Sequence, residues 1–275
     1  VSRDLGGLLA KFTDNSTEPD LKRWKKLAER DTTEYKQEIT IGLVAKYADN
    51  SDTYLSVTEA LKSAAWAEKC EVNIRWINAE TASDKDFSEV DGLLVPGGFG
   101  ARGVEGKIAA AKYCIKNNKP YLGLCLGLQV AVIAAARQGG VQDANSEEFG
   151  AKSGANVIYI MDGQQGKQST GGTMRLGDYE SVLIPNSQAA RAYGSNEVVE
   201  RHRHRYEVNQ DFTQSIEQGG LIISGTSPDG RLVEFVEAPT NDYFVATQAH
   251  PEFKSRPFRP HPLFTGLMRA AKSSE

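Results

Sequence analysis

The chain has 275 residues, of which 32 are Lys or Arg and 36 are Asp or Glu, so its formal net charge is −4. This slightly acidic balance excludes general binding to nucleic acid and to an anionic membrane surface. Hydrophobic residues at 40% and charged residues at 25% are typical of a globular protein with one large α/β domain or two small ones.

Cysteine usage and hydropathy indicate the cellular setting. Cys70, Cys114 and Cys125 are widely spaced and odd in number, so they form no disulfide framework and predict a reducing, cytoplasmic environment. No segment approaches the ~18 consecutive apolar residues of a membrane span. Residues 1–13 carry too much charge around too short an apolar run to be a signal peptide.

The N-terminal part is rich in charge and poor in β-branched residues. Residues 1–38 are therefore predicted to be a linker or extension, with a short helix that begins at Pro19-Asp20. No break in composition divides the remaining residues, so we expect a single domain over residues 39–275.

Strands alternate with helices over the first hundred residues of this domain. Apolar spacing predicts strands at 38–47, 71–78, 91–100 and 120–125, and helices at 54–69, 104–118 and 126–138. Such alternation predicts an α/β fold, with an open, mostly parallel sheet flanked by helices on both faces.

The second half is richer in β structure and less regular. It begins with a glycine-rich loop at 162–180 and ends with a helix near 262–272. Strands are expected near 199–209, 220–226, 231–237 and 243–249.

Gly123-Leu-Cys125-Leu-Gly127 stands where a predicted strand passes directly into a predicted helix. A nucleophile on such a strained turn needs small neighbours, and this pentapeptide matches the cysteine form of the Gly-x-Ser-x-Gly elbow. A helix N-terminus also favours a thiolate. The pentapeptide alone leaves open that Cys125 is a buried core cysteine.

Two further stretches are expected at the carboxyl edge of the sheet, where ligands of open parallel sheets bind. "VPGGFG" (95–100) offers backbone N–H groups for an oxyanion, and "ATQAHPEF" (246–253) ends a strand with His250 and Glu252. A thiol nucleophile needs an imidazole base and a group that orients it, so Cys125, His250 and Glu252 form a candidate triad. The alternative for His250 is an ordinary surface or core histidine.

Two other patterns are weaker. "GGFGARGVEGK" (97–107) fails as a phosphate-binding loop because Ala101 and Ile108 occupy its required Gly and Ser/Thr positions. "RHRHR" (201–205) places His202 and His204 on one strand face, but no third ligand is close in sequence, so no metal site is expected. We interpret these residues as a solvated basic cluster, of which one arginine could bind a carboxylate.

Together these stretches resemble the class I glutamine amidotransferases. The similarity extends to the glutaminase domains of CTP synthases from about residue 39 to the C-terminus. It is carried by "DANSEEF" (143–149), "GGTMRLG" (171–177), "ERHRHRYEVN" (200–209) and "HPEFKSRPFRPHPLF" (250–264). Leu128, Glu147 and Thr53 depart from the family's usual Met, Thr and smaller residue. The family's N-terminal synthetase domain is not among these 275 residues.

The resemblance implies a role for each matching residue. Cys125 is the nucleophile, His250 and Glu252 complete the triad, and the backbone N–H groups of Gly98 and Leu126 form the oxyanion hole. The implied glutamine-binding residues are Gly98, Leu126, Gly127, Leu128, Gln129, Glu148 and Arg205. A guanidinium suits the carboxylate of a free amino acid, and a carboxylate with an amide oxygen suits its ammonium. From the residues alone, Glu148 could instead cap a helix, and Gln129 could simply be a polar residue in a first helical turn.

The resemblance also implies the function. L-Glutamine is hydrolysed to glutamate and ammonia, and in the full-length ligase the ammonia aminates UTP to CTP in a synthetase domain that uses ATP and Mg²⁺. GTP is the implied allosteric activator, with Arg102 and the 171–177 loop as contributors, and the full-length enzyme is a homo-oligomer. No cofactor or metal is expected in this domain. The alternatives are another thiol hydrolase of the fold, such as a γ-glutamyl hydrolase, and a non-catalytic assembly or regulatory domain.

Overall fold

The computed structural model describes residues 7, 11–13, 20–46, 51–150, 155–160 and 174–273. The chain divides into two units, Val1–Glu34 and Tyr35–Glu275. In the first unit, α2 (Lys22–Asp31) has no buried residue. The short charged helix expected from Pro19-Asp20 is therefore present and contributes nothing to a core. No helix of the described residues is long and apolar enough to span a bilayer.

The second unit is built on a nine-stranded sheet with the order β2-β1-β3-β4-β12-β11-β10-β7-β8. Its parallel half consists of β2 (Glu71–Asn78), β1 (Glu38–Ala45), β3 (Gly92–Val95), β4 (Tyr121–Leu124) and β12 (Phe244–Thr247). Its antiparallel half consists of β11 (Val233–Glu237), β10 (Ile222–Thr226), β7 (Arg175–Leu183) and β8 (Glu197–His204). The mostly parallel sheet predicted from the alternating elements is confirmed where strands alternate with helices.

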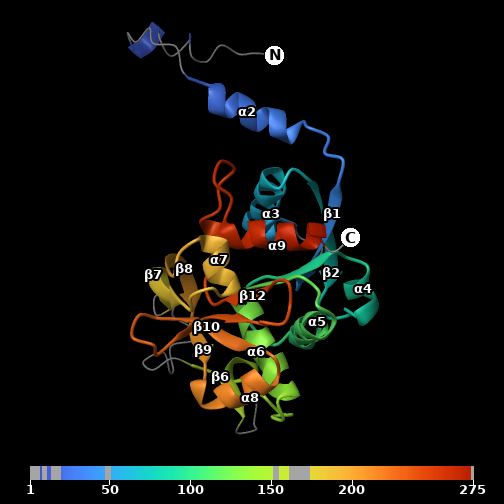
Figure 1. The fold of residues 1–275 in the computed structure, drawn as a ribbon, viewed down its shortest axis with the longest axis vertical. Helices are drawn as coiled ribbons and strands as arrows, with labels where there is room; N and C mark the ends of the chain where they lie inside the picture. The colour runs from blue at the N-terminus through green and yellow to red at the C-terminus, as the bar shows by residue number, and fades with distance from the viewer. Residues whose placement is uncertain are drawn as a thin grey trace. The chain divides into compact units, whose positions relative to one another are not determined.

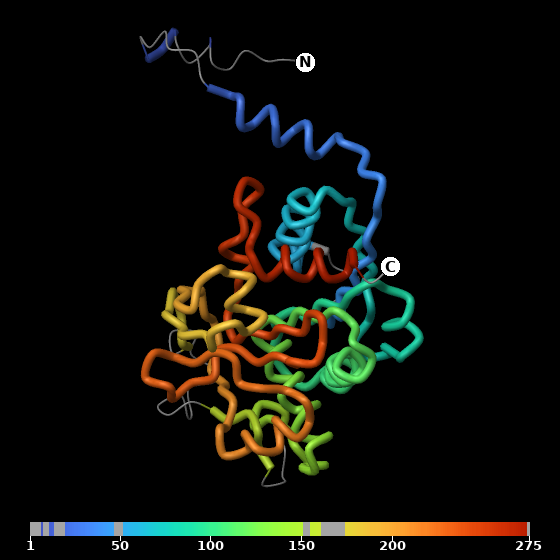
Figure 2. The backbone as a smooth tube through the Cα atoms, in the orientation of Figure 1, coloured from blue at the N-terminus to red at the C-terminus, as the bar shows by residue number. Residues whose placement is uncertain are grey.

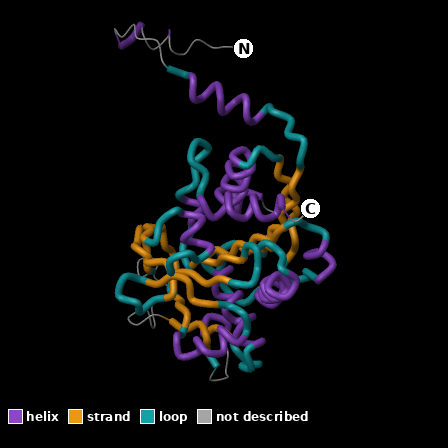
Figure 3. The backbone as a smooth tube through the Cα atoms, in the orientation of Figure 1, coloured by secondary structure: helices purple, strands orange, loops and turns teal. Residues whose placement is uncertain are grey.

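Helices cover both faces of this sheet (Figures 1 and 3). One side carries α3 (Leu55–Ala67), α7 (Gln188–Tyr193) and α9 (Pro262–Ser273), and the other α5 (Val104–Asn117), α6 (Leu126–Gln138) and α8 (Thr213–Gln218). The short α4 (Asp84–Ser88) precedes β3. A second, three-stranded sheet has the order β5-β6-β9, from Asn145–Ser146, Asn156–Ile160 and Tyr206–Val208.

The burial of β1 explains why the central strands consist of consecutive apolar residues. Ile41 and Leu43 belong to the core on the α3 and α9 side, whereas Val44 belongs to the core on the α5 and α6 side. A parallel strand covered on both faces has little need for polar alternation. The C-terminal helix α9 completes one of these cores by packing beside α3, far from it in sequence (Figure 2).

Two predicted boundaries were wrong. Residues 175–180, expected in the glycine-rich loop, belong to β7, which pairs along its length with β8. The single strand expected near 199–209 is two strands in different sheets, β8 and β9, with Arg205 between them. In both places the partner strand, which is distant in sequence, decides the structure. The rest of the expected loop, 162–173, lies outside the described residues.

The turn from β4 into α6 depends on two glycines. A Cβ on Gly127 would overlap the carbonyl oxygen of Val95 in β3, and a Cβ on Gly123 would lie 2.8 Å from the carbonyl group of Gly127. The first turn of α6 therefore packs directly on two strands, with no room for side chains. This contact holds Cys125 at the carboxyl edge of the sheet.

We predict that Gly127→Ala destabilises the fold by ~3 kcal/mol or more, because the added methyl group meets rigid backbone. This loss would occur although alanine has the higher helix propensity. The matched control is Gly98→Ala, whose Cβ would make ordinary contacts at 3.5 Å and 3.7 Å. Urea unfolding of both variants measures the difference, and equal stabilities would contradict the proposed packing constraint.

Candidate active site

Cys125 occupies the predicted elbow with a strained backbone. Its φ of 53° and ψ of −100° lie outside the usual regions for a residue with a side chain. Its N–H donates to Thr247 O in β12 at 2.8 Å, and its carbonyl accepts from the N–H of Leu128 at 3.0 Å. The side chain is 3% exposed. β12 and α6 therefore both contribute to holding Cys125 at the carboxyl end of β4.

His250 and Glu252 follow β12 at the same edge. The Nδ1 of His250 lies 2.7 Å from Oε1 of Glu252, and the imidazole stacks on the Phe253 ring. Burial lowers the pKa of His250, but hydrogen bonds and negative charge from Cys125 and Glu252 outweigh this and raise it to about 10. The three predicted residues therefore lie together, in an arrangement that favours the protonated form of the imidazole.

The Gly97-Gly98 turn lies against this group. A Cβ on Gly97 would come within 2.8 Å of Cε1 of His250 and 3.5 Å of the Cβ of Cys125. A Cβ on Gly98 would lie 3.5 Å from Cδ2 of Leu126. The two residues expected to provide oxyanion donors are therefore neighbours, and the turn leaves no space for a side chain beside the imidazole.

Glu148 and Arg205 are also brought to this edge. Oε1 of Glu148 accepts from the Gly100 N–H at 2.7 Å. Burial raises the pKa of Glu148 above its usual value. The Gly100 hydrogen bond and the charges of Lys46 and Arg205 act in the opposite direction but are outweighed. The carboxylate of Glu148 therefore lies beside the glycine turn, and the charge of Arg205 acts on it.

Gln129 and Leu128 are both buried. Gln129 is 3% exposed, and its Nε2 donates to Tyr206 O and to Oε1 of Gln248, both at 3.3 Å. Leu128 is fully buried in the core. Gly127 has no side chain, so it can contact a ligand only through its backbone.

Sequence reasoning missed Gln248 and Lys107. Gln248 is fully buried, and its Nε2 lies 3.7 Å from Sγ of Cys125. Its place two residues before His250, at the end of β12, was the available signal. Lys107 was considered only as part of a failed phosphate loop, yet it is 1% exposed and its Nζ donates to Pro96 O.

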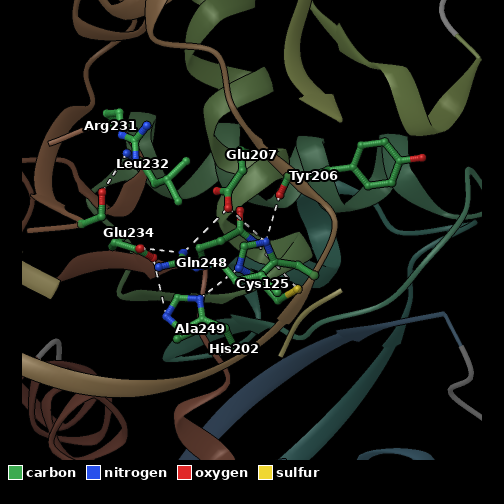
Figure 4. Close-up of polar contacts among 12 residues, drawn as sticks. Cys125, His202, Tyr206, Glu207, Arg231, Leu232, Glu234, Gln248 and Ala249 are labelled. Carbon is green, nitrogen blue, oxygen red and sulfur yellow. Dashed lines mark hydrogen bonds and ion pairs between the residues drawn. The ribbon is translucent and has the colours of Figure 1, made fainter. Parts of the chain in front are cut away.

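A buried polar cluster, of which His202, Glu207 and Glu234 are labelled in Figure 4, lies near Cys125 and Gln248. Arg175 pairs with Glu234 at 2.6 Å and lies 3.7 Å from Glu207. Nδ1 of His202 is 2.9 Å from Nε2 of His204, whose own Nδ1 is 3.1 Å from Tyr206 O. A carbonyl only accepts, so His204 donates through Nδ1 and accepts at Nε2 from His202.

The cluster corrects the interpretation of "RHRHR". Burial, with nearby positive charge, lowers the pKa of His202 to about 2 and that of His204 to about 3. These histidines are neutral and buried rather than members of a solvated basic cluster, whereas Arg201 and Arg203 are exposed. Within the described part of the chain, no group of three or more His, Cys, Asp or Glu is arranged to hold a metal ion.

The residues expected to contribute to GTP control are only partly described. Arg102 pairs with Glu80 at 2.9 Å and donates to Lys46 O. Residues 171–173 of the 171–177 loop lie outside the described residues. Arg175, from the same stretch, is 7% exposed and belongs to the buried cluster.

We predict that Cys125→Ala lowers the pKa of His250. The parent imidazole should lose its proton only as pH rises through about 10. Without the thiolate, less negative charge counteracts the effect of burial on His250, so the pH midpoint of the His250 titration should fall. NMR titration of the His250 ring, assigned with His250→Gln, measures this. Cys70→Ala removes another buried thiol and should leave the midpoint in place; an unchanged midpoint in Cys125→Ala would show that the two groups do not interact.

Comparison with known proteins gives a consistent result. Residues 50–270 match the family described as Glutamine amidotransferase class-I. The CTP synthase of Methanocaldococcus jannaschii is 50% identical over 265 residues, which cover 92% of this chain and 49% of that protein. The CTP synthase of Carboxydothermus hydrogenoformans is 52% identical over 262 residues, which cover 92% of this chain and 48% of that protein. The chain thus spans about half the length of these curated relatives.

A solved structure matches the fold as a whole. The glutaminase domain of the Trypanosoma brucei CTPS, determined with bound acivicin, superimposes with a TM-score of 0.80 and 40% sequence identity. The alignment covers 86% of this chain and 95% of that one. Cys125, His250 and Glu252 all fall within the matched family segment. This chain belongs to the class-I glutamine amidotransferases, in the group formed by the glutaminase domains of CTP synthases.

Proposed function

We propose that residues 39–275 form a glutaminase domain that hydrolyses L-glutamine to glutamate and ammonia through Cys125, His250 and Glu252. The observation that carries this proposal is the strained turn at Cys125, beside an imidazole whose Nδ1 lies 2.7 Å from Glu252. A thiol nucleophile, a base and an orienting carboxylate are the groups that amide hydrolysis through a thioester requires.

The chemistry proceeds in two acyl-transfer steps. The Cys125 thiolate attacks the side-chain amide carbon of glutamine, and the N–H groups of Gly98 and Leu126 stabilise the oxyanion. His250 protonates the departing amine, which leaves as ammonia while a thioester forms. His250 then takes a proton from water, whose oxygen attacks the thioester, and glutamate leaves with the thiolate restored.

Selection of a free amino acid is assigned to groups around the glycine turn. Arg205 binds the α-carboxylate, and Glu148 with the amide oxygen of Gln129 binds the α-ammonium. Backbone groups from Leu126 to Gln129 and at Gly98 complete the glutamine site. The hydrogen bond from Gly100 to Glu148 supports this assignment, because it holds the carboxylate beside the turn.

In the longer protein that the curated relatives represent, we propose that the ammonia aminates UTP to CTP. A synthetase part would use ATP and Mg²⁺ for this step, and GTP would activate the glutaminase. The identities of 50% and 52% to two CTP synthases support this assignment. Assembly as a homo-oligomer in the cytoplasm belongs to the same proposal.

The test of the nucleophile is Cys125→Ala. We expect ammonia release from glutamine to fall by about 10⁶-fold, to background, because the thioester cannot form. A glutamine-like diazo ketone should label Cys125 in the parent, and Cys70→Ala should leave labelling and hydrolysis intact. Retained hydrolysis in a folded Cys125→Ala variant would refute the assignment.

The test of the carboxylate site is Arg205→Ala. Losing a charged hydrogen bond to the substrate costs ~1.5–3 kcal/mol, which corresponds to a ten- to hundredfold fall in kcat/KM. Arg203→Ala changes an exposed arginine on the same segment and serves as the control. The parent should also discriminate against glutamine with a blocked α-carboxylate. A larger effect from Arg203→Ala would shift the assignment to that residue.

A further inference from the structure

A buried lysine that the proposed mechanism does not use lies beside the oxyanion turn. Lys107, in the second turn of α5, is 1% exposed. Its Nζ donates to Pro96 O at 3.2 Å and lies 3.7 Å from the position that a Cβ on Gly98 would occupy. The ammonium therefore reaches both ends of the Pro96-Gly97-Gly98 segment.

Close packing holds α5 in this position. A Cβ on Gly106 would overlap the carbonyl oxygen of Ala79, which follows β2. Because glycine has no Cβ, α5 can pack directly against the backbone at the end of β2. Glu105 forms a two-point ion pair with Arg137 of α6, at 2.7 Å and 3.0 Å. The helix that carries Lys107 is thereby linked to the helix that begins after Cys125.

Other charged groups fix the far end of the same turn. Lys46 donates from Nζ to Phe99 O at 3.0 Å, and Glu148 accepts from the Gly100 N–H at 2.7 Å. Lys107 is the member of this set that contacts the segment next to Cys125 and His250. Its removal should therefore affect the oxyanion donor at Gly98 more than the distal part of the turn.

The charge of Lys107 has no carboxylate partner among the described residues, where Pro96 O is its only hydrogen-bond acceptor. Burial lowers the pKa of Lys107 to about 8; the charge on Cys125 opposes this shift and that of Lys46 adds to it. An ammonium has three donors, so two N–H groups remain after the bond to Pro96. A buried cation without a carboxylate costs stability, which makes a purely structural role a poor explanation.

We propose that Lys107 is a positioning residue of the glutaminase site: its ammonium holds the Pro96-Gly97-Gly98 segment against Cys125 and stabilises the negative charge of the thiolate and the oxyanion. This inference rests on the proposed function and adds a cation to it. We expect Lys107 to affect kcat rather than KM, because its ammonium interacts with negative charge that develops during the reaction and not with the bound substrate.

The test compares Lys107→Met, Lys107→Gln and the control Lys112→Met, which changes an exposed lysine of the same helix. Glutamine hydrolysis gives kcat and KM, and urea unfolding gives stability. Alkylation of Cys125 by iodoacetamide at neutral pH, followed by peptide mass spectrometry, reports the thiolate without using the glutamine site.

For Lys107→Met we expect kcat to fall by ~10²–10³-fold, the effect of losing one oxyanion donor, with KM close to that of the parent. Alkylation of Cys125 should slow, and stability should stay equal or rise because an apolar side chain replaces a buried charge. Lys107→Gln keeps a donor for Pro96 O but loses the charge, so its kcat should fall less than that of Lys107→Met. This variant also decides the matter if Lys107→Met does not fold.

Unchanged kcat and alkylation in a folded variant would overturn the role of Lys107 while leaving the glutaminase proposal intact. A fall in kcat only in proportion to lost stability would also overturn it. If the parent releases no ammonia, the glutaminase proposal fails, and the alkylation rates then decide separately whether Lys107 stabilises the thiolate.

Discussion

Backbone contact between β3, β4 and the first turn of α6 is the constraint on which the site depends. The contact exists because Gly123 and Gly127 have no side chains, so α6 begins directly at the carboxyl end of β4. Cys125 then takes a positive φ and is placed beside Thr247 of β12. Because β3 and β12 flank β4 in the sheet, the turn after β3 and the His250 segment after β12 reach the same edge.

Charges around this edge differ in how they are stabilised. His250 has the Cys125 thiol and Glu252 as partners, which favour its protonated form. Among the described residues, the ammonium of Lys107 has a single hydrogen-bond acceptor, the carbonyl oxygen of Pro96. Such buried charges are stable only where fixed dipoles or opposite charges replace water. Preorganised groups of this kind stabilise charge that develops during a reaction, since they need no reorganisation.

Hydrogen bonds connect the nucleophile to the buried cluster in the antiparallel half. They run from Sγ of Cys125 to Gln248, Gln129 and Tyr206 O, and from there to His204. Neutral imidazoles extend this network without placing a further positive charge behind the thiol. The β8 and β9 strands, which lie in different sheets, thereby support the site that the parallel half presents.

The sequence by itself determined the parallel half, the elbow and the His-x-Glu pair, because apolar period, glycine spacing and neighbouring chemical groups are local properties. Even the convergence of Cys125 and His250 followed from a general rule, that the carboxyl ends of parallel strands share one edge. Only the tertiary structure decided that residues 175–180 form a strand, that the chain changes sheets at Arg205, and that Lys107 and His202 are buried. Strand pairing and burial depend on segments far apart in the chain, and residue type alone does not report whether water or packed protein surrounds a charge.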